Sequence, residues 1–298
     1  MIRLVCAALA ALALSACAAT TTAETQNFPP GPALFVARDA DSTMYLFGTL
    51  HIRRPDQPWG GARAQEGLAE TAEVWTEIPI SPESDAAIQS LTFRYGLAEP
   101  GRPLSSYFND EENARIRAAA QRAGVQPAML EAFKPWLAGV TLSVMPMIQA
   151  GYDPEAGADR LIDAYADEHG KTMRSFETAE QQIQMLAGLS EEAQRQMLLE
   201  SLSEIDAGVA QMEEMTNAWQ NGDLTTLERL VVTEMRAEYP EFYRALLVER
   251  NNAWVTVLTR ELEGAGVDFV AVGAGHMLGP DGVIAQLRAR GYTVERVE

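Results

Sequence analysis

Two of the three histidines in this chain follow directly after apolar runs that have the character of buried strands. The run 44–47 leads into Gly48-Thr49-Leu50-His51, and the run 267–272 leads into Gly273-Ala274-Gly275-His276. Glycine lets the backbone turn sharply where a strand ends, so each G-x-x-H motif is expected to present its histidine at the mouth of a sheet. An imidazole in that position can bind a metal ion or transfer a proton.

Two carboxylates are expected beside these histidines. Glu177 follows a short strand predicted over 171–176, and Thr178 and Gln181 are spaced as the capping box of the next helix. If the strands run parallel, their carboxyl ends share one edge of the sheet with both G-x-x-H motifs. Glu77 is the one charge in the middle of EVWTEIPI, a strand predicted over 73–80. A lone carboxylate inside a strand needs a partner.

A polar pair, Arg250 and Asn251, lies on the inward face of a helix predicted over 240–263. Both residues align with apolar neighbours at three- and four-residue spacing. Buried polar groups require partners, and two interpretations remain open. The pair belongs to a structural network or a solvated flank, or it directs a guanidinium and an amide at a substrate anion or carbonyl.

Two imidazoles and one or two carboxylates would meet the need of a hydrolytic metal for about three protein ligands and one open position. Donors of this kind suit zinc, manganese or cobalt, and a remaining carboxylate can act as a general base. The sequence has no H-E-x-x-H motif and no G-x-S-x-G elbow. The rival interpretation is a non-catalytic envelope protein that binds a peptide, haem or another apolar ligand.

The elements that must hold these residues alternate between strands and helices. The patterns predict a hairpin over 33–47, a helix over 62–71, and mostly helical segments after residue 105, one of which ends at His169. A final helix over 279–291 and a strand over 292–297 close a β-helix-β unit around His276, with strands expected to be parallel. The predicted fold class is therefore mixed α/β: a central, largely parallel sheet flanked by helices, with a large helical insertion at about 105–265.

The first 16 residues have the pattern of a secretory signal peptide, with a basic residue, a short apolar core and small residues. Leu14-Ser15-Ala16-Cys17 resembles a bacterial lipobox, which predicts cleavage before Cys17 and attachment of lipid to that cysteine. An ordinary signal-peptidase cleavage near this point is the alternative. Residues 17–32 are small, polar and proline-containing, as in a flexible tether, and 33–298 form one domain.

The charge and the cysteines limit the partners of the mature protein. The full chain has a formal net charge of −19, and this excess of acidic residues argues against nucleic acid, because binding there depends on neutralising phosphates with Lys and Arg. Membrane contact is expected through the lipid only, in the bacterial envelope and on the outer membrane facing the periplasm, since Ala18 is not an aspartate-type retention signal. Cys6 lies in the removed segment, so no disulfide is available.

Four segments together resemble the TraB/GumN family, which is related to the Tiki proteins and more distantly to erythromycin-esterase and ChaN-like folds. They are YLFGTLHI (45–52), FETAEQQ (176–182), ERNNAW (249–254) and VGAGHMLGPDGVIAQLRARGYTVERV (272–297). The resemblance covers essentially the whole mature chain. It implies a mixed α/β core with a helical insertion and, for Tiki-like members, a metal-dependent peptidase that uses two G-x-x-H motifs.

Carried over by position, the resemblance implies His51 and His276 as metal ligands, with Glu177 and Glu77 as acidic partners. The sequence therefore predicts a metal-dependent hydrolase that acts on peptide bonds, with a peptide or a small molecule as its ligand. Its divalent transition metal would be held by His51, His276 and Glu177, with Glu77 and Arg250 as catalytic residues. Asn251 and the glycines Gly48, Gly273 and Gly275 are expected to orient the substrate.

Overall fold

The computed structural model describes residues 31–207 and 209–298. The expected signal peptide (1–16), the expected lipidation site Cys17 and nearly all of the expected tether (17–32) lie outside these residues. Within the described ranges, no helix combines the length and the apolar character that a membrane crossing requires.

The described strands form a single six-stranded sheet in the order β4-β3-β5-β2-β1-β6. Their bounds are β1 (Leu34–Arg38), β2 (Ser42–Thr49), β3 (Glu73–Thr76), β4 (Thr172–Ser175), β5 (Gly266–Gly273) and β6 (Thr293–Arg296). The neighbours β4, β3, β5 and β2 pair in parallel, whereas β1 pairs antiparallel with both β2 and β6. The prediction of a mixed α/β fold with a largely parallel sheet is confirmed.

The predicted hairpin and the predicted closing unit are both present. β1 and β2 form the hairpin, with Leu34 opposite Phe47. The chain passes from β5 through α14 (Val283–Ala289) to β6, and β6 runs in the same direction as β5. These two strands are not neighbours, because β2 and β1 lie between them.

One predicted strand is too long. β3 ends at Thr76 and does not continue to Ile80. Thr76 Oγ1 donates a hydrogen bond to the carbonyl of Ile78, which folds the chain out of the sheet, and Pro79 then has no N–H for a ladder. Glu77 is therefore not inside a strand: it lies just beyond the end of one, at the same edge as the other predicted site residues.

Alternate residues of the strands face two apolar layers, as the pleat of a sheet requires. Phe269 and Ala271 pack in one cluster with residues of α1 (Ala62–Glu70) and α6 (Ala158–Glu168). Val270 and Val272 pack in the other with residues of α13 (Glu249–Leu262) and α14. The sheet thus lies between two helical layers that fix the positions of its strand ends.

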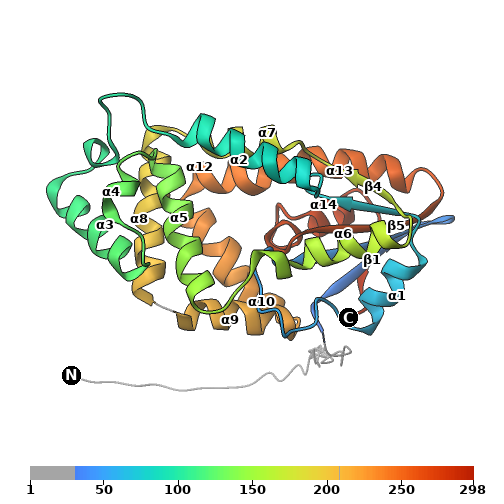
Figure 1. Ribbon diagram of the computed structural model, residues 1–298. Coiled ribbons are helices and arrows are strands. Elements are labelled where there is room, and N and C mark those ends of the chain that lie inside the picture. The colour runs from blue at the N-terminus through green and yellow to red at the C-terminus, as the bar shows by residue number, and fades with distance from the viewer. Residues whose placement is uncertain (1–30, 208) are drawn as a thin grey trace, which may run out of the picture.

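The rest of the molecule is mainly helical and comes largely from the part of the chain between β3 and β5. Figure 1 shows the strands at one end of an elongated molecule and α3, α4, α5 and α8 at the other. The remaining helices up to residue 220 are α2 (Pro82–Gly96), α3 (Asp110–Arg122), α4 (Pro127–Leu130), α5 (Pro135–Gln149), α7 (Ala179–Ala187), α8 (Glu191–Ala207) and α9 (Val209–Gln220), with short 3-10 turns η1 (Leu104–Tyr107) and η2 (Pro154–Ala156). A separate apolar cluster holds α3, α4, α5 and α8 together.

The helix expected over 240–263 is present as an unbroken run from Pro240 to Leu262 that contains a π-helical turn. It consists of α12 (Pro240–Tyr243), the π-helical turn η4 (Arg244–Val248) and α13. A second π-helical turn, η3 (Arg229–Thr233), lies between α10 (Leu224–Glu228) and α11 (Glu234–Glu238). π-Helical turns are rare and often occur at functional sites, and both of these adjoin the site described next.

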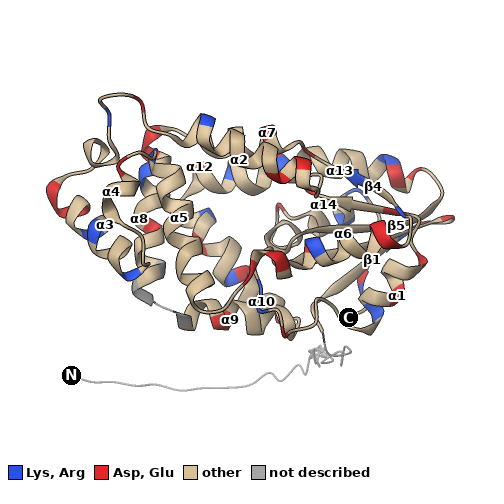
Figure 2. Ribbon diagram, viewed as in Figure 1, with Lys and Arg blue, Asp and Glu red and all other residues tan. Residues whose placement is uncertain are grey.

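Charged residues are spread over the outer helices. Figure 2 shows Lys and Arg interspersed singly with Asp and Glu on this face. Some acidic side chains are nevertheless buried at the strand ends, and their partners define the candidate site.

Candidate functional site

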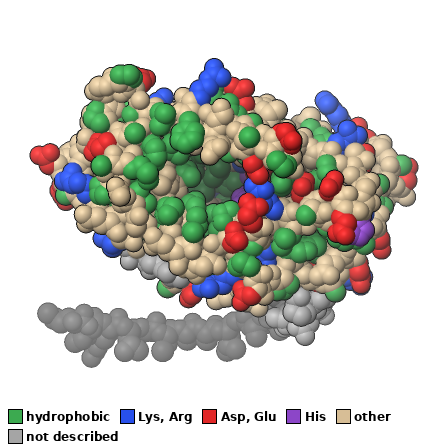
Figure 3. Space-filling model, in the orientation of Figure 1, with side chains coloured by type: hydrophobic (Ala, Val, Ile, Leu, Met, Phe, Trp, Pro, Cys, Tyr) green, Lys and Arg blue, Asp and Glu red, His purple; other side chains and the backbone are tan. Residues whose placement is uncertain are grey.

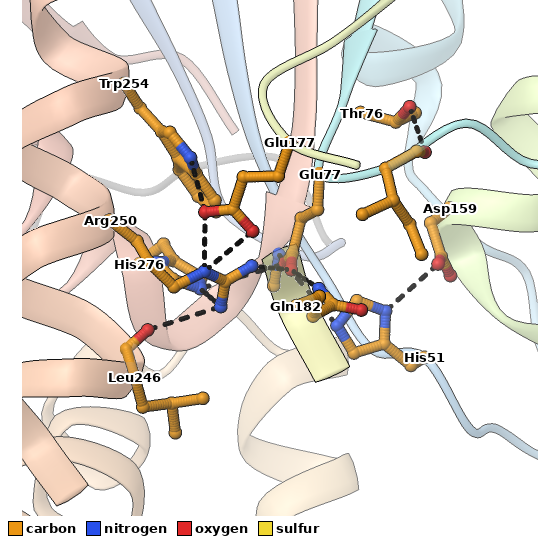
Figure 4. Close-up of polar contacts among 12 residues, drawn as sticks. His51, Thr76, Glu77, Asp159, Glu177, Gln182, Leu246, Arg250, Trp254 and His276 are labelled. Carbon is orange, nitrogen blue, oxygen red and sulfur yellow. Dashed lines mark hydrogen bonds and ion pairs between the residues drawn. The ribbon is translucent and has the colours of Figure 1, made fainter. Parts of the chain in front are cut away.

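Four residues predicted from the sequence meet at the carboxyl edge of the parallel strands. His51 follows β2, Glu77 follows β3 and Glu177 follows β4, while His276 lies in the 3-10 turn η5 (Ala274–Met277) that follows β5. The order of the strands places the four side chains along one edge, where ligands bind in open α/β sheets. Figure 4 shows them pointing toward one another beside Arg250 and Trp254 of α13.

His276 is buried and held at both ring nitrogens. Its Nδ1 lies 2.7 Å from Asn251 Oδ1, and its Nε2 lies 3.0 Å from Arg250 Nη1. The amide oxygen can only accept and the guanidinium can only donate, so Nδ1 carries the proton and Nε2 presents a lone pair. Burial, together with the charge of Arg250, lowers the pKa of His276 to about 3 against the opposing effect of Glu77. This imidazole is neutral.

His51 lies at the surface of the same site. Its Nδ1 is 3.0 Å from Asp159 Oδ2, and its Nε2 is 3.5 Å from Glu77 Oε1. Desolvation acts to lower the pKa of His51, but the carboxylates of Asp159 and Glu77 outweigh it and raise the pKa well above its usual value. Without a bound ion, His51 is therefore protonated near neutral pH.

Glu77 is the buried centre of the cluster. Its Oε1 accepts from the backbone N–H of Gly273 at 2.7 Å, and its Oε2 accepts from Arg250 Nη2 at 2.6 Å and from Gln182 Nε2 at 3.1 Å. Burial would raise the pKa of this carboxyl, but the cationic His51 and Arg250 hold it well below its usual value. Glu77 is ionised at neutral pH.

Arg250 joins the buried carboxylate of Glu77 to the partly buried carboxylate of Glu177. Its Nε donates to Glu177 Oε1 at 2.8 Å, in addition to the contact of Nη2 with Glu77. Glu177 Oε1 also accepts from the indole N–H of Trp254 at 3.0 Å. Glu177 therefore contacts Arg250 and Trp254, whereas Glu77 is the carboxylate that lies between the two histidines.

Glu77 and the two histidines come closest together beside Gly273. A Cβ atom placed on Gly273 would lie 3.1 Å from Glu77 Oε1, 3.2 Å from His51 Nε2 and 3.6 Å from His276 Cδ2. Only glycine leaves this space open. A cavity of about 120 Å³ adjoins it, lined by His51, Glu77, Asp159, Gln182, Ile78 and Ile80 among others.

The other two predicted glycines serve close packing of the turns. A Cβ on Gly48 would lie 2.9 Å from the Cα of Ala274, so the two G-x-x-H turns touch at backbone distance. A Cβ on Gly275 would lie 2.9 Å from Cγ1 of Val231, in the π-helical turn η3. Both glycines thus let neighbouring segments approach the turn that carries His276.

Asp159 and Gln182 were not identified from the sequence as site residues. Asp159 lies in the first turn of α6 and Gln182 in the first turn of α7. The capping box at Thr178 is confirmed and fixes where α7 begins. Nothing local indicates which side chain of a first turn will face the sheet edge, because that depends on how the helix packs.

The side chains as they stand are not a preformed metal site. Within 31–207 and 209–298, no group of three or more His, Cys, Asp or Glu side chains is arranged to hold a metal ion. At the buried histidine, the Arg250 guanidinium occupies the position that a metal ion would need, because it donates a hydrogen bond to the lone pair of His276 Nε2.

Comparison with known proteins places the chain in a family. It is 24% identical to the uncharacterized protein YbaP of Escherichia coli (strain K12) over 263 residues, which are 86% of this chain and 92% of YbaP. The match to YbaP of Shigella flexneri has the same identity and coverage. No solved structure matches. The TraB/PrgY/gumN family model matches residues 33–296, from the first strand of the sheet to the last. The chain belongs to the TraB/PrgY/gumN family.

Proposed function

We propose that this protein is a metal-dependent hydrolase whose site is the cluster of His51, Glu77, His276 and Arg250. The observation that carries the proposal is the convergence of Glu77 Oε1 and both imidazoles on the open space at Gly273. Strand-end clusters of buried, strongly perturbed titratable groups are typical of catalytic sites. Peptide bonds are the substrate class to test first, because the resemblance to Tiki-like members implies a peptidase.

The donor set fits a divalent transition metal. Glu77 Oε1 lies 3.5 Å from His51 Nε2 and 3.8 Å from His276 Nε2. Donors that share a tetrahedral ion at bond lengths of about 2.0–2.1 Å are roughly 3.4 Å apart. Asp159 and Asn251 hold the outer ring nitrogens, as carboxylates and amides do around metal-binding histidines.

The charges of the cluster also favour a divalent ion. Glu77 and Glu177 both contact the single guanidinium of Arg250, and Asp159 contacts His51. With both imidazoles neutral, Glu77 and Glu177 together carry one more negative charge than Arg250 neutralises. In this proposal His51, His276 and Glu77 hold the ion, and Arg250 Nη1 must release His276 Nε2, since one lone pair cannot serve both.

A bound divalent ion would supply Lewis acidity, which polarises a carbonyl and makes water a better nucleophile. The protein's own groups account for the remaining steps. Glu77 is ionised, as a carboxylate that holds the ion must be. The Arg250 guanidinium, once it releases His276, can stabilise the negative charge that develops on a carbonyl oxygen. Glu177 and Trp254 hold Arg250 in position for this.

Metal content tests the proposal directly. The protein is loaded with zinc, manganese or cobalt at pH 8, where His51 loses its proton more readily, and is analysed for bound metal and for cleavage of a peptide library. We expect about one ion per chain, and loss of both the ion and cleavage in His51→Ala and Glu77→Gln. His169→Ala is the matched control, because His169 is exposed and contacts only its own helix through Tyr165 O. Absence of cleavage with every metal would overturn the proposal.

We also propose that the protein is an envelope lipoprotein anchored through Cys17. The support is the lipobox-like segment before that residue. Labelling of cells with a radioactive or clickable fatty acid should mark the protein, and Cys17→Ser should remove the label and release the protein from the membrane fraction. An unlabelled protein in the soluble fraction would contradict this.

A further inference from the structure

The helical part of the molecule contains a large cavity that the proposed chemistry does not use. One chamber of about 310 Å³ is bounded by α5, α8, α9, η3, α11 and α12, and a second of about 550 Å³ is bounded mainly by α5, α8, α9 and η3. The two share Ser143, Gln211, Met215 and Leu230 as lining residues, so they are adjacent. Figure 3 shows this face of the molecule deeply hollowed, with hydrophobic side chains along the rim of the hollow.

The walls of this cavity are rich in methionine. Five of the protein's 12 methionines line it, namely Met147, Met197, Met212, Met215 and Met235. Methionine side chains are flexible and polarizable, and they adapt to apolar ligands of variable shape. Volumes of about 300–1,000 Å³ are those of small-molecule sites. We propose that this cavity binds an acyl chain attached to a neutral headgroup.

The polar groups of the walls argue for an acyl chain and against a peptide. Most of them already have partners: Gln149 Nε2 donates to Ala123 O, Gln196 Nε2 to Glu192, and Ser201 Oγ to Leu198 O. Tyr239 OH donates to Glu200. A peptide would bring backbone N–H and C=O groups that need partners of their own, and leaving them unpaired in an apolar cavity is costly. An acyl chain has no such groups.

The charges of the walls argue for a neutral headgroup. Glu200 and Glu234 line the first chamber, and no described residue that lines it is a lysine or an arginine. The second chamber has one basic lining residue, Arg122, which itself has a polar contact. A free fatty-acid carboxylate would therefore meet like charge in the first chamber, whereas an ester or an amide would not.

The cavity and the candidate site share a wall. Val231 lines the first chamber, and its Cγ1 would be 2.9 Å from a Cβ on Gly275, the residue before His276. Leu247, in the other π-helical turn, packs against the same position of Gly275. An acyl chain bound here would therefore adjoin the turn of His276, and, if the proposed hydrolase function holds, the molecule whose peptide bond is cleaved carries an acyl chain.

Binding can be measured without any assumption about catalysis. The probe is the methyl ester of parinaric acid, a neutral acyl ester whose fluorescence rises in an apolar environment. It is titrated into the full-length Cys17→Ser protein, which lacks the proposed lipid anchor, in detergent-free buffer. We expect saturable binding with one probe per chain. Monoacylglycerols should displace the probe, and chains of 12 to 16 carbons should be more effective than chains of eight.

Filling the cavity provides the matched comparison. Met215→Trp places a larger side chain where the chambers meet and should weaken probe binding at least tenfold. Met129→Trp is the control, because Met129 is 50% exposed and lies outside the cavity, and it should leave binding unchanged. Met147→Trp, in the second chamber, provides the same test if Met215→Trp does not fold.

Two results would overturn the acyl-chain site: binding that does not saturate, or binding that folded Met215→Trp and Met147→Trp leave unchanged. Displacement by an apolar decapeptide as effective as that by a monoacylglycerol would overturn the choice of an acyl chain over a peptide. Glu77→Gln should bind the probe as well as the unaltered protein. Failure of hydrolysis and failure of acyl binding are thus observed separately.

Discussion

The two G-x-x-H turns follow parallel neighbouring strands and carry the same residue types at the same spacing, but their histidines have opposite surroundings. The side chain of His51 is 54% exposed, whereas that of His276 is 5% exposed. The outer nitrogen of His51 faces a carboxylate, that of Asp159, and the outer nitrogen of His276 faces the neutral amide of Asn251. The pKa is raised for His51 and lowered for His276.

This difference in surroundings indicates different roles for the two histidines. His276 is neutral, fixed at both nitrogens and enclosed, as expected of a ligand or positioning group that must not change its charge. His51 changes its charge within reach of solvent, and it alone adjoins the small cavity beside Glu77. Glu77 lies between the two and contacts both sides. The predictions that follow test whether one turn is a rigid support and the other an adjustable, solvent-facing half.

The largest effect is expected at Arg250, which contacts the His276 side of the cluster. Arg250→Met would leave Glu177 without a counter-charge and Glu77 with that of His51 alone, and removal of one partner from a buried ion pair costs about 3–5 kcal/mol. We expect the free energy of unfolding, measured with urea, to fall by that amount. Arg244→Met is the control, because Arg244 is 64% exposed and pairs with Glu249 at 3.5 Å, and such pairs contribute at most about 1 kcal/mol.

The second prediction compares the histidines themselves. His276→Gln should lower the free energy of unfolding by about 1–3 kcal/mol, because buried partners of the imidazole lose well-directed hydrogen bonds. His51→Gln should cost less than about 1 kcal/mol, as exposed polar contacts do. Both variants should lose at least about 100-fold in hydrolysis. Equal losses of stability would contradict the division into a rigid and an adjustable half.

The third prediction compares the first glycine of each motif. Gly273→Ala fills the space between His51 and Glu77 without removing any polar group, so we expect loss of metal binding and hydrolysis with a change in stability below about 1 kcal/mol. Gly48→Ala instead pushes against the backbone of Ala274, and overpacking of this kind costs about 1–3 kcal/mol. Thermal unfolding and metal titration of both variants distinguish the two effects. An active Gly273→Ala protein would place the chemistry elsewhere.

The sequence predicted the edge of the sheet well, because its signals are local. Apolar runs followed by glycine marked the ends of β2 and β5, and parallel pairing then brought His51, His276 and Glu177 to one edge. Glu77 was correctly named as a site residue, but its strand was predicted to be too long: the strand pattern continues through Ile78, although the hydrogen bond of Thr76 to the Ile78 carbonyl ends the strand. The alternation of residue types along the sequence does not reveal such a turn.

Local sequence patterns could not identify the contacts that helical residues make in the site. Asp159 is one of several acids on α6, and only the packing of that helix turns it toward His51. The same limit explains Arg250: the helical spacing indicated an inward-facing polar residue, but not that its guanidinium would lie between Glu77 and Glu177. Those contacts join segments more than 70 residues apart in the chain.

The smallest effect concerns protonation. The chain has three histidines, so the ring signals of His51 and His276 can be assigned by NMR from their loss in the Gln variants. In metal-free protein His276 should stay neutral from pH 5 to pH 8, whereas His51 should titrate above its ordinary pKa of about 6.5. Asp159→Asn should bring the pKa of His51 back toward that value, because the neighbouring negative charge is gone.

Asp159→Asn also tests how the contribution of His51 to the free energy of unfolding changes with pH. Because the folded-state pKa of His51 is raised, its stabilisation is fully present below the unfolded pKa and is lost as the pH rises through the folded value. The stability advantage of the unaltered protein over Asp159→Asn should therefore be largest near pH 6 and should shrink as the pH rises. Solvent screening at this half-exposed side chain limits it to about 1 kcal/mol. An advantage that grows with pH would mean that Asp159 stabilises the fold through other contacts and that His51 is not held as a cation.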